Sequence, residues 1–201
     1  MRRRFQSLLC LAAGLGVTLC AATPAAAHPH IWIKDTATLN MEKGQIVSVS
    51  QDWTFDSFFS AALIKDFDRN KDAKFDAEEI ALLRKNAFVA LKDFGFFTHV
   101  RVDGKKISLT DVKAFSAKIS DGKVVYSFTL GLPQSVDPRK SKAAFLFYDH
   151  TYYVDVALTG SPSVSLKNGS GCSLAIRDDT ANPIYFGLVV PKMVAVSCAA
   201  G

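Results

Sequence analysis

Short runs in which apolar and polar residues alternate recur along most of this chain, and they constrain its fold more than any other feature. Residues 30–39 and 46–53 alternate in this way on either side of the break Glu42-Lys43-Gly44. Alternation directs the apolar side chains to one face of a strand, and a short break containing glycine joins two strands into a hairpin. This part of the sequence therefore predicts a β-hairpin.

The spacing of the apolar residues changes between residues 55 and 93. Apolar side chains recur at helical spacing from 55 to 67 and again from 77 to about 93, where Gly95 is the expected stop. The chain then returns to alternation. Later strands are expected at residues 98–102, 107–119, 124–132, 143–148, 152–158, 164–166, 172–176 and 185–197. The sequence thus predicts an α+β fold, an antiparallel β core with an inserted helix-loop-helix (EF-hand-like) pair at residues 55–93.

The segment between the two expected helices, DRNKDAKFDAEE, fits the calcium-binding loop of an EF-hand. That loop needs oxygen-bearing side chains at positions one, three, five, nine and twelve, and a backbone carbonyl at position seven. The residues at these positions are Asp68, Asn70, Asp72, Asp76 and Glu79, with Lys74 in the seventh place. Because calcium takes six to eight oxygen ligands, we expect a structural calcium ion here.

The loop departs from the pattern at its sixth position, which holds Ala73 in place of glycine. The turn there uses a positive φ, which costs a residue with a Cβ atom roughly 1 kcal/mol. The alternative interpretation is a solvated acidic turn that caps the following helix, since Asp and Asn are common in such turns.

The first 27 residues have the three-part layout of a secretory signal peptide. Three arginines at positions 2–4 precede an apolar run from 8 to 22, and the small residues Ala25 and Ala27 precede the expected cleavage point. The run is shorter than the ~20 residues of a membrane-spanning helix. We therefore expect cleavage after Ala27 and a single periplasmic domain over residues 28–201.

Two further features of the leader bear on localisation and partners. Residues 17–20 resemble a lipobox, but the bulky Leu19 stands where a small residue is needed, so a lipoprotein is not favoured. Removing the three leader arginines lowers the formal net charge from +5 to +2, and lysine and arginine do not cluster with aromatic residues. Nucleic acid is therefore not an expected partner.

Cys172 and Cys198 are the two cysteines that remain after cleavage. An even pair in an oxidising compartment predicts a disulfide. The alternative, a thiolate metal site, is less favoured because neither cysteine has a ligand-type neighbour at short spacing.

Cleavage after Ala27 leaves His28 at the mature N-terminus, followed by Pro29 and His30. A terminal amine and imidazoles favour borderline metals such as Cu(II), Ni(II) or Zn(II) over calcium. Pro29 argues against the square-planar amino-terminal copper and nickel motif, because that motif needs an amide N–H at the second residue. A chelate from the amine and ring of His28 remains, and His30 can join it.

A third ligand has to come from elsewhere in the chain. Asp149 and His150 are the preferred candidates because they stand at an expected turn between two aromatic strands, whereas His99 is interpreted as a surface strand residue. The alternative interpretation is that the terminal histidines are simply solvated and that Asp149 only shapes its turn.

Five segments together resemble a known family: HPHIWI, WTFD, the acidic loop, FFTHVRVDG and YDHTYYVD. The chain is similar over essentially its whole mature length to the bacterial periplasmic family called domain of unknown function 1007. The resemblance implies a periplasmic component of a transport system, handling transition-metal ions beside transporters of the nickel/cobalt type. It also implies proline where this chain has His150, so it does not support His150 as a ligand shared by the family.

We therefore expect a metal-binding accessory or solute-binding protein rather than an enzyme. It would hold Ni, Co, Zn or Cu through His28 and His30 and present the ion to a membrane transporter, with calcium as a second, structural ion. Two alternatives stay open: a copper-dependent oxidative enzyme that uses an N-terminal histidine brace, and a calcium-stabilised structural module of the envelope. No Ser-His-Asp set, phosphate loop or CxxC pair supports another chemistry.

Overall fold

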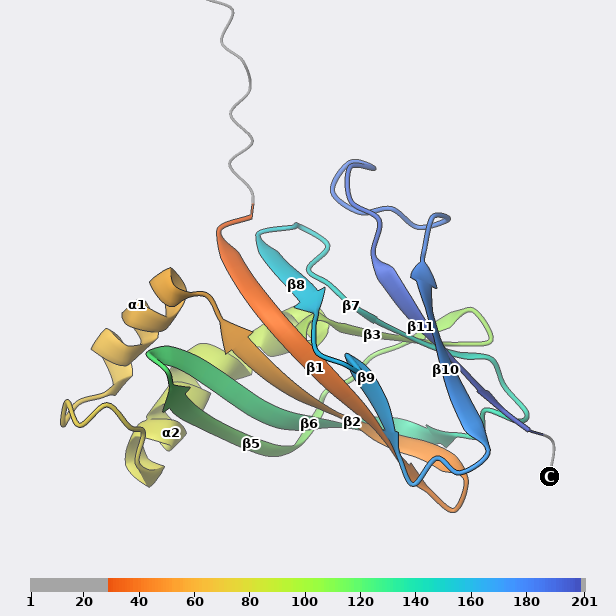
Figure 1. The fold of residues 1–201 in the computed structure, drawn as a ribbon, viewed down its shortest axis with the longest axis horizontal. Helices are drawn as coiled ribbons and strands as arrows, with labels where there is room; N and C mark the ends of the chain where they lie inside the picture. The colour runs from red at the N-terminus through yellow and green to blue at the C-terminus, as the bar shows by residue number, and fades with distance from the viewer. Residues whose placement is uncertain (1–28, 200–201) are drawn as a thin grey trace, which may run out of the picture.

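The structure of the chain is a computed structural model, which describes residues 29–199. In this part of the chain two β-sheets share one hydrophobic core, and two short α-helices lie beside β5 and β6 (Figure 1). The first sheet contains β1 (Ile31–Glu42), β2 (Gln45–Phe55), β5 (Asp111–Ser120), β6 (Lys123–Val136), β8 (Val154–Leu158) and β9 (Val164–Lys167). The second contains β3 (Thr98–Val102), β4 (Lys105–Ile107), β7 (Ala143–Phe147), β10 (Cys172–Asp178) and β11 (Lys192–Cys198). The expected signal peptide and His28 lie outside the described residues.

The predicted N-terminal hairpin is confirmed. β1 and β2 pair antiparallel, with Leu39 opposite Val49, and both side chains are fully buried. Lys43 and Gly44 make the connection with φ values of 50° and 75°, a left-handed conformation that glycine adopts without steric cost. The buried face of β1 also includes Asp35, whose side chain enters the apolar core.

The predicted α+β fold with an inserted EF-hand-like pair is wrong. Strands dominate the described residues, and the α-helices among them are only α1 (Ser57–Phe67) and the seven-residue α2 (Ala77–Leu83). After α2 the chain continues as a π-helix, η1 (Arg84–Phe88), and a 3-10 segment, η2 (Val89–Phe97). Apolar spacing alone does not separate these hydrogen-bonding patterns from a continuous α-helix. The fold is therefore mostly β, without the helix pair of an EF-hand in the described residues.

The expected antiparallel core is a mixed sheet. β1 pairs in parallel with β8, where Ile33 lies opposite Val156, and with β9, where Leu39 lies opposite Leu166. Alternation specifies which face of a strand is buried, but it carries no information about the direction of the neighbouring strand.

The strand expected at residues 185–197 begins only at Lys192, as β11. Tyr185, Phe186 and Gly187 have φ values of 48°, 57° and 85°, which no β-strand accommodates. Residues 179–191 instead form the β10–β11 loop, which projects beyond the sheet (Figure 1).

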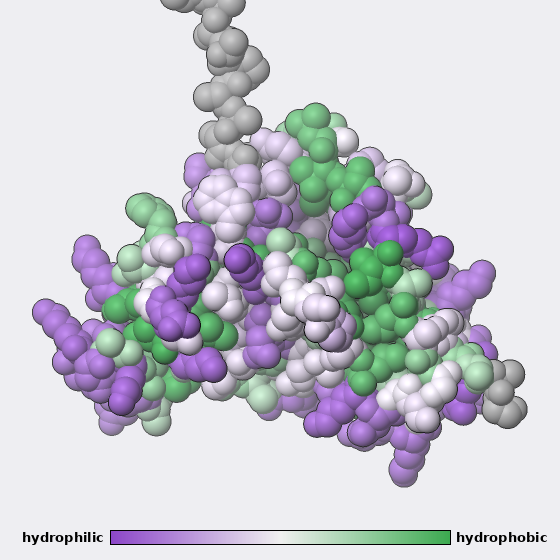
Figure 2. All heavy atoms as spheres, in the orientation of Figure 1, coloured by the Kyte–Doolittle hydropathy of each residue, from purple (hydrophilic) through white to green (hydrophobic). Residues whose placement is uncertain are grey.

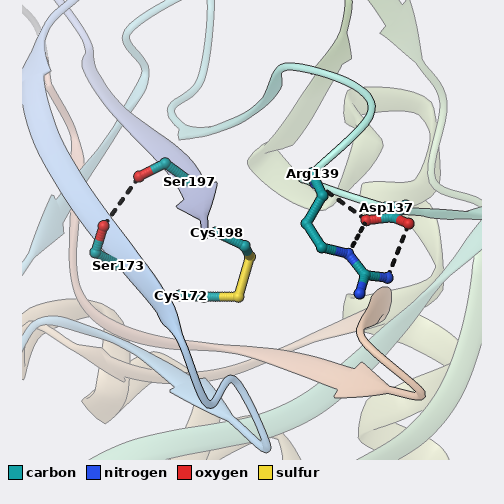
Figure 3. The surroundings of a disulfide bond; sticks show 6 residues. All are labelled: Asp137, Arg139, Cys172, Ser173, Ser197 and Cys198. Carbon is teal, nitrogen blue, oxygen red and sulfur yellow. Dashed lines mark hydrogen bonds and ion pairs between the residues drawn. A yellow bond between two sulfur atoms is a disulfide. The ribbon is translucent and has the colours of Figure 1, made fainter. Parts of the chain in front are cut away.

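The predicted disulfide between Cys172 and Cys198 is confirmed. The two cysteines lie opposite each other at one end of the β10–β11 pair. The Ser173 and Ser197 hydroxyls beside them are 2.9 Å apart and hydrogen-bonded (Figure 3). Such a bond is typical of proteins in oxidising compartments outside the cytoplasm.

Among the helices of residues 29–199, none combines the length and the apolar character that crossing a membrane requires.

Candidate metal-binding sites

The turn between β7 and β8 is built around the carboxylate of Asp149. Its Oδ1 accepts a hydrogen bond from the Thr151 N–H at 2.9 Å, and its Oδ2 accepts from the Thr151 hydroxyl at 2.7 Å and the Val154 N–H at 3.1 Å. The side chain is buried. Asp149, a predicted metal ligand, therefore shapes the turn, and coordination of an ion would compete with these hydrogen bonds.

His99 lies on β3 against the start of this turn. Its Nε2 lies 2.9 Å from the backbone oxygen of Tyr148, and its ring stacks on the Tyr148 ring with 4.0 Å between centroids. Because a carbonyl oxygen can only accept, Nε2 carries the proton of this hydrogen bond.

The protonation of His99 suits a metal ligand. Burial lowers the pKa of the His99 imidazole, the Tyr148 hydrogen bond opposes this effect, and the positive charge of Lys106 lowers the pKa further. A neutral ring with its proton on Nε2 has its lone pair on Nδ1, the arrangement in which a backbone carbonyl orients a ligating histidine.

His99 and His150 line one cavity of about 450 Å³ beside η2. The His150 side chain is 65% exposed, and its Nδ1 lies 3.9 Å from Asp149 Oδ1. At the far end of the same turn, the His30 N–H donates to the Tyr153 carbonyl at 2.9 Å, and the two rings are 4.7 Å apart. The β7–β8 turn thus brings His30, His99 and His150 to one end of the protein.

The predicted transition-metal ligands are only partly assembled. His28 lies outside the described residues, and within residues 29–199 no group of three or more His, Cys, Asp or Glu side chains is close enough to hold a metal ion. Sequence reasoning interpreted His99 as a surface strand residue and did not place it beside His150. Alternation places it on the outer face of its strand, but only the pairing of β3 with β7, which sets His99 opposite Leu146, brings it beside Tyr148 and His150.

In the acidic loop at residues 68–79, side-chain oxygens accept hydrogen bonds from backbone N–H groups of the same loop. Asn70 Oδ1 accepts from the Asp72 N–H, and Asp72 Oδ1 accepts from the Lys74 N–H, each at 2.9 Å. Ala73 has a φ of 62°, the left-handed value expected of the sixth position. Asn70, Asp72 and Lys74 are all exposed.

The ends of the loop are held by its two buried carboxylates, Asp68 and Glu79. Glu79 Oε1 accepts from the Arg69 N–H at 2.7 Å, and its Oε2 accepts from the Asp76 N–H at 3.0 Å. Asp76 in turn accepts from the Glu79 N–H and caps α2. Bidentate binding of a cation by Glu79 would therefore replace hydrogen bonds that it makes in this structure.

One oxygen of the loop is buried without a hydrogen bond. Asp68 Oδ2 accepts from the Ala73 N–H at 3.1 Å, whereas Oδ1 has no partner, and the residue is only 7% exposed. An unpartnered buried oxygen is costly, and a bound cation is one way to satisfy it.

Comparisons with known proteins identify relatives without an assigned activity. The family described as "Protein of unknown function (DUF1007)" matches residues 13–185. An "Uncharacterized 15.5 kDa protein in trpE 3'region" from Spirochaeta aurantia is 36% identical over 137 residues, which cover 67% of this chain and 97% of that protein. An uncharacterized protein of Haemophilus influenzae is 27% identical over 142 residues, covering 70% of this chain and 68% of that protein.

Proposed function

The chain belongs to the DUF1007 family, and we propose that it is an exported accessory protein that binds a transition-metal ion for a membrane transporter. The role in transport follows the resemblance described above. The metal-binding role rests on the residues of this chain: His99 and His150 line one cavity, and His30 is hydrogen-bonded to the turn that carries His150.

The ligand set begins with the two histidines at the expected mature N-terminus. Cleavage after Ala27 gives His28 a free amine beside its imidazole. His30 follows two residues later, and its N–H donates a hydrogen bond to the Tyr153 carbonyl. His150, on the same turn and largely exposed, is the third proposed ligand. These nitrogen ligands suit Ni(II), Co(II), Zn(II) or Cu(II) rather than calcium. Asp149 is left out, because both of its oxygens accept hydrogen bonds within the turn.

Metal titration of the mature protein tests this proposal. The protein is purified from the periplasm, its N-terminus is read by mass spectrometry, and Ni(II), Co(II), Zn(II) and Cu(II) are titrated calorimetrically. Changing His28 and His30 together to alanine should weaken binding at least about a hundredfold, and His150→Gln at least about tenfold, since losing even an outer-shell partner of a metal ligand typically costs about 10–100-fold in affinity. Equal affinities in the variants and the parent protein would overturn the proposal.

A matched control separates the terminal amine from the imidazoles. A protein with one glycine added before His28 keeps every histidine but moves the amine away from the chelate. It should bind more weakly than the parent and more tightly than the variant without His28 and His30. Parent-like binding by the extended protein would exclude the amine as a ligand.

Calcium binding by the loop at residues 68–79 is a second candidate function, favoured by the unpartnered Asp68 Oδ1. Calcium should raise the thermal unfolding temperature of the parent protein, and Asp68→Asn should abolish that rise. Asp66→Asn is the matched control, because Asp66 is an exposed carboxylate on α1 outside the ligand pattern. If calcium leaves the unfolding temperature of the parent unchanged, the loop is only a capped acidic turn.

A further inference from the structure

The β10–β11 loop is held firmly at its base. The Asp179 N–H donates to the Pro191 carbonyl at 2.9 Å, which closes the loop. Asp179 Oδ2 lies 2.7 Å from Arg101 Nη1 in a largely buried ion pair, and Asp179 Oδ1 accepts from the Asn182 side chain at 2.9 Å. These contacts fix the base of the loop on the second sheet. The residues at the far end of the loop therefore have a defined position relative to that sheet.

The far end, residues 185–188, is defined here as the aromatic tip. Ile184 and Val189 pair across its neck. Phe186 is 95% exposed and Leu188 is 76% exposed. Figure 2 shows apolar side chains standing clear of the body at this end of the molecule. A tip of this kind exposes its largest apolar residues where most loops expose polar ones.

Two adjacent residues of the tip have a left-handed backbone conformation although neither is glycine. Tyr185 and Phe186 have φ values of 48° and 57°, a conformation that turns normally assign to Gly, Asn or Asp. Nothing in the fold itself requires a phenylalanine at residue 186, because its side chain is almost entirely in solvent.

The tip lies at the end of the protein where the described chain begins. The Tyr185 ring is 5.6 Å from the Tyr152 ring of the β7–β8 turn, whose Tyr153 carbonyl accepts hydrogen bonds from His30 and Ile31. Figure 1 shows the start of β1, this turn and the loop together. Trp32, at the start of β1, is also 49% exposed. The 28 residues that precede the described chain, with their apolar run, join it at this end.

We propose that the aromatic tip inserts into the surface of a lipid bilayer, with Phe186 and Leu188 among the acyl chains. Phenylalanine and leucine partition into that region, and tyrosine and tryptophan prefer the headgroup level. The tip is too small for a stable protein interface, since two side chains supply about 200–400 Å² against the roughly 800 Å² that each partner contributes. A precursor tethered by its signal peptide would present this end to the membrane. The proposal does not depend on metal binding.

Flotation with lipid vesicles tests the proposal, using phosphatidylcholine vesicles and vesicles of phosphatidylethanolamine with phosphatidylglycerol. The parent protein should float with both. The variant Phe186→Gly with Leu188→Ser should bind the vesicles at least about tenfold more weakly than the parent, because it loses both inserted side chains. Val89→Ser is the control, since Val89 is a partly exposed apolar residue on η2, outside the aromatic tip, and this variant should bind like the parent.

Two measurements distinguish insertion from a structural role or from attraction of charge. Glycine suits the positive φ at residue 186, so the tip variant should unfold at the same temperature as the parent or higher. A Phe186→Trp variant in a Trp32→Phe background leaves only the fully buried Trp53 as a second indole, and its emission should shift to the blue and be quenched by lipids brominated in the acyl chain. Absence of flotation, the result expected if the tip docks on a protein, overturns the proposal, as does parent-like flotation of the tip variant.

Discussion

Asp35 in β1 lies directly opposite Trp53 in β2 and is fully buried, yet neither of its carboxylate oxygens accepts a hydrogen bond. The Trp53 indole N–H donates instead to Gln51 Oε1 at 3.2 Å. Burial raises the pKa of Asp35 well above its ordinary value, and the negative charge of Asp52 raises the pKa further. The polar N–H of the neighbouring Trp53 side chain lowers the pKa by a smaller amount. The folded protein therefore binds a proton at Asp35 more tightly than the unfolded chain does.

Asp35→Asn should change how the stability depends on pH. Because the folded pKa of Asp35 is raised, its protonation stabilises the fold fully below the unfolded pKa of ~3.9, and this contribution is lost as pH rises through the folded pKa. The parent should lose about 1.4 kcal/mol per pH unit relative to the asparagine variant across that window. Urea unfolding of both proteins between acid and neutral pH measures the difference.

The exposed Asp93→Asn variant makes the same substitution at the surface and is the control for Asp35. A constant difference between the parent and Asp35→Asn from pH 4 to pH 8 would mean that Asp35 does not change its protonation on folding.

Ala73→Gly should stabilise the protein by roughly 0.5–1 kcal/mol, even without calcium. The φ of Ala73 is 62°, where an alanine Cβ is strained and glycine is not. Ala81→Gly makes the same chemical change inside α2 and should cost about 1 kcal/mol. Thermal unfolding in a chelator compares the two. Destabilisation by both substitutions would show that residue 73 is not held in the left-handed conformation.

The sequence predicted local structure well and spatial neighbours poorly. Alternation located β1, β2 and the faces they bury, because side-chain direction in a strand is set by adjacent residues. The Cys172–Cys198 bond was predictable from composition and compartment. The pairing of β1 with β8 and of β3 with β7 was not, since neither pattern nor spacing specifies partners distant in the sequence.

The same distinction explains the outcome at the candidate sites. The loop at residues 68–79 is contiguous, so the pattern correctly anticipated the positive φ of Ala73, although the helix following it was mistaken for a longer one. The histidines of the candidate site come from separate segments of the chain. His99 could not be placed beside His150 until the β7–β8 turn was known.

Replacing both Cys172 and Cys198 by serine should lower the free energy of unfolding by about 3.5 kcal/mol. The bond closes a loop with a sequence separation of 26, and its removal restores that conformational entropy to the unfolded chain. Urea unfolding with and without reductant measures the loss. Reductant should destabilise the parent and leave the serine variant unchanged; a parent that is equally stable in reductant would contradict the entropic argument.

The Arg101–Asp179 ion pair should matter more for the β10–β11 loop than for the sheets. Its side chains are only 14% and 6% exposed, so Asp179→Asn leaves a buried guanidinium without its counter-charge and should cost about 3–5 kcal/mol. Replacing both partners by apolar residues, Arg101→Met with Asp179→Leu, should recover much of that loss, because no buried charge remains. In both variants the amides of residues 179–191 should exchange with solvent faster than in the parent, since the charged Asp179 carboxylate that binds both Arg101 and Asn182 is lost. Unchanged exchange in this segment, measured by mass spectrometry, would mean that the Pro191 carbonyl and the sheet alone hold the aromatic tip in place.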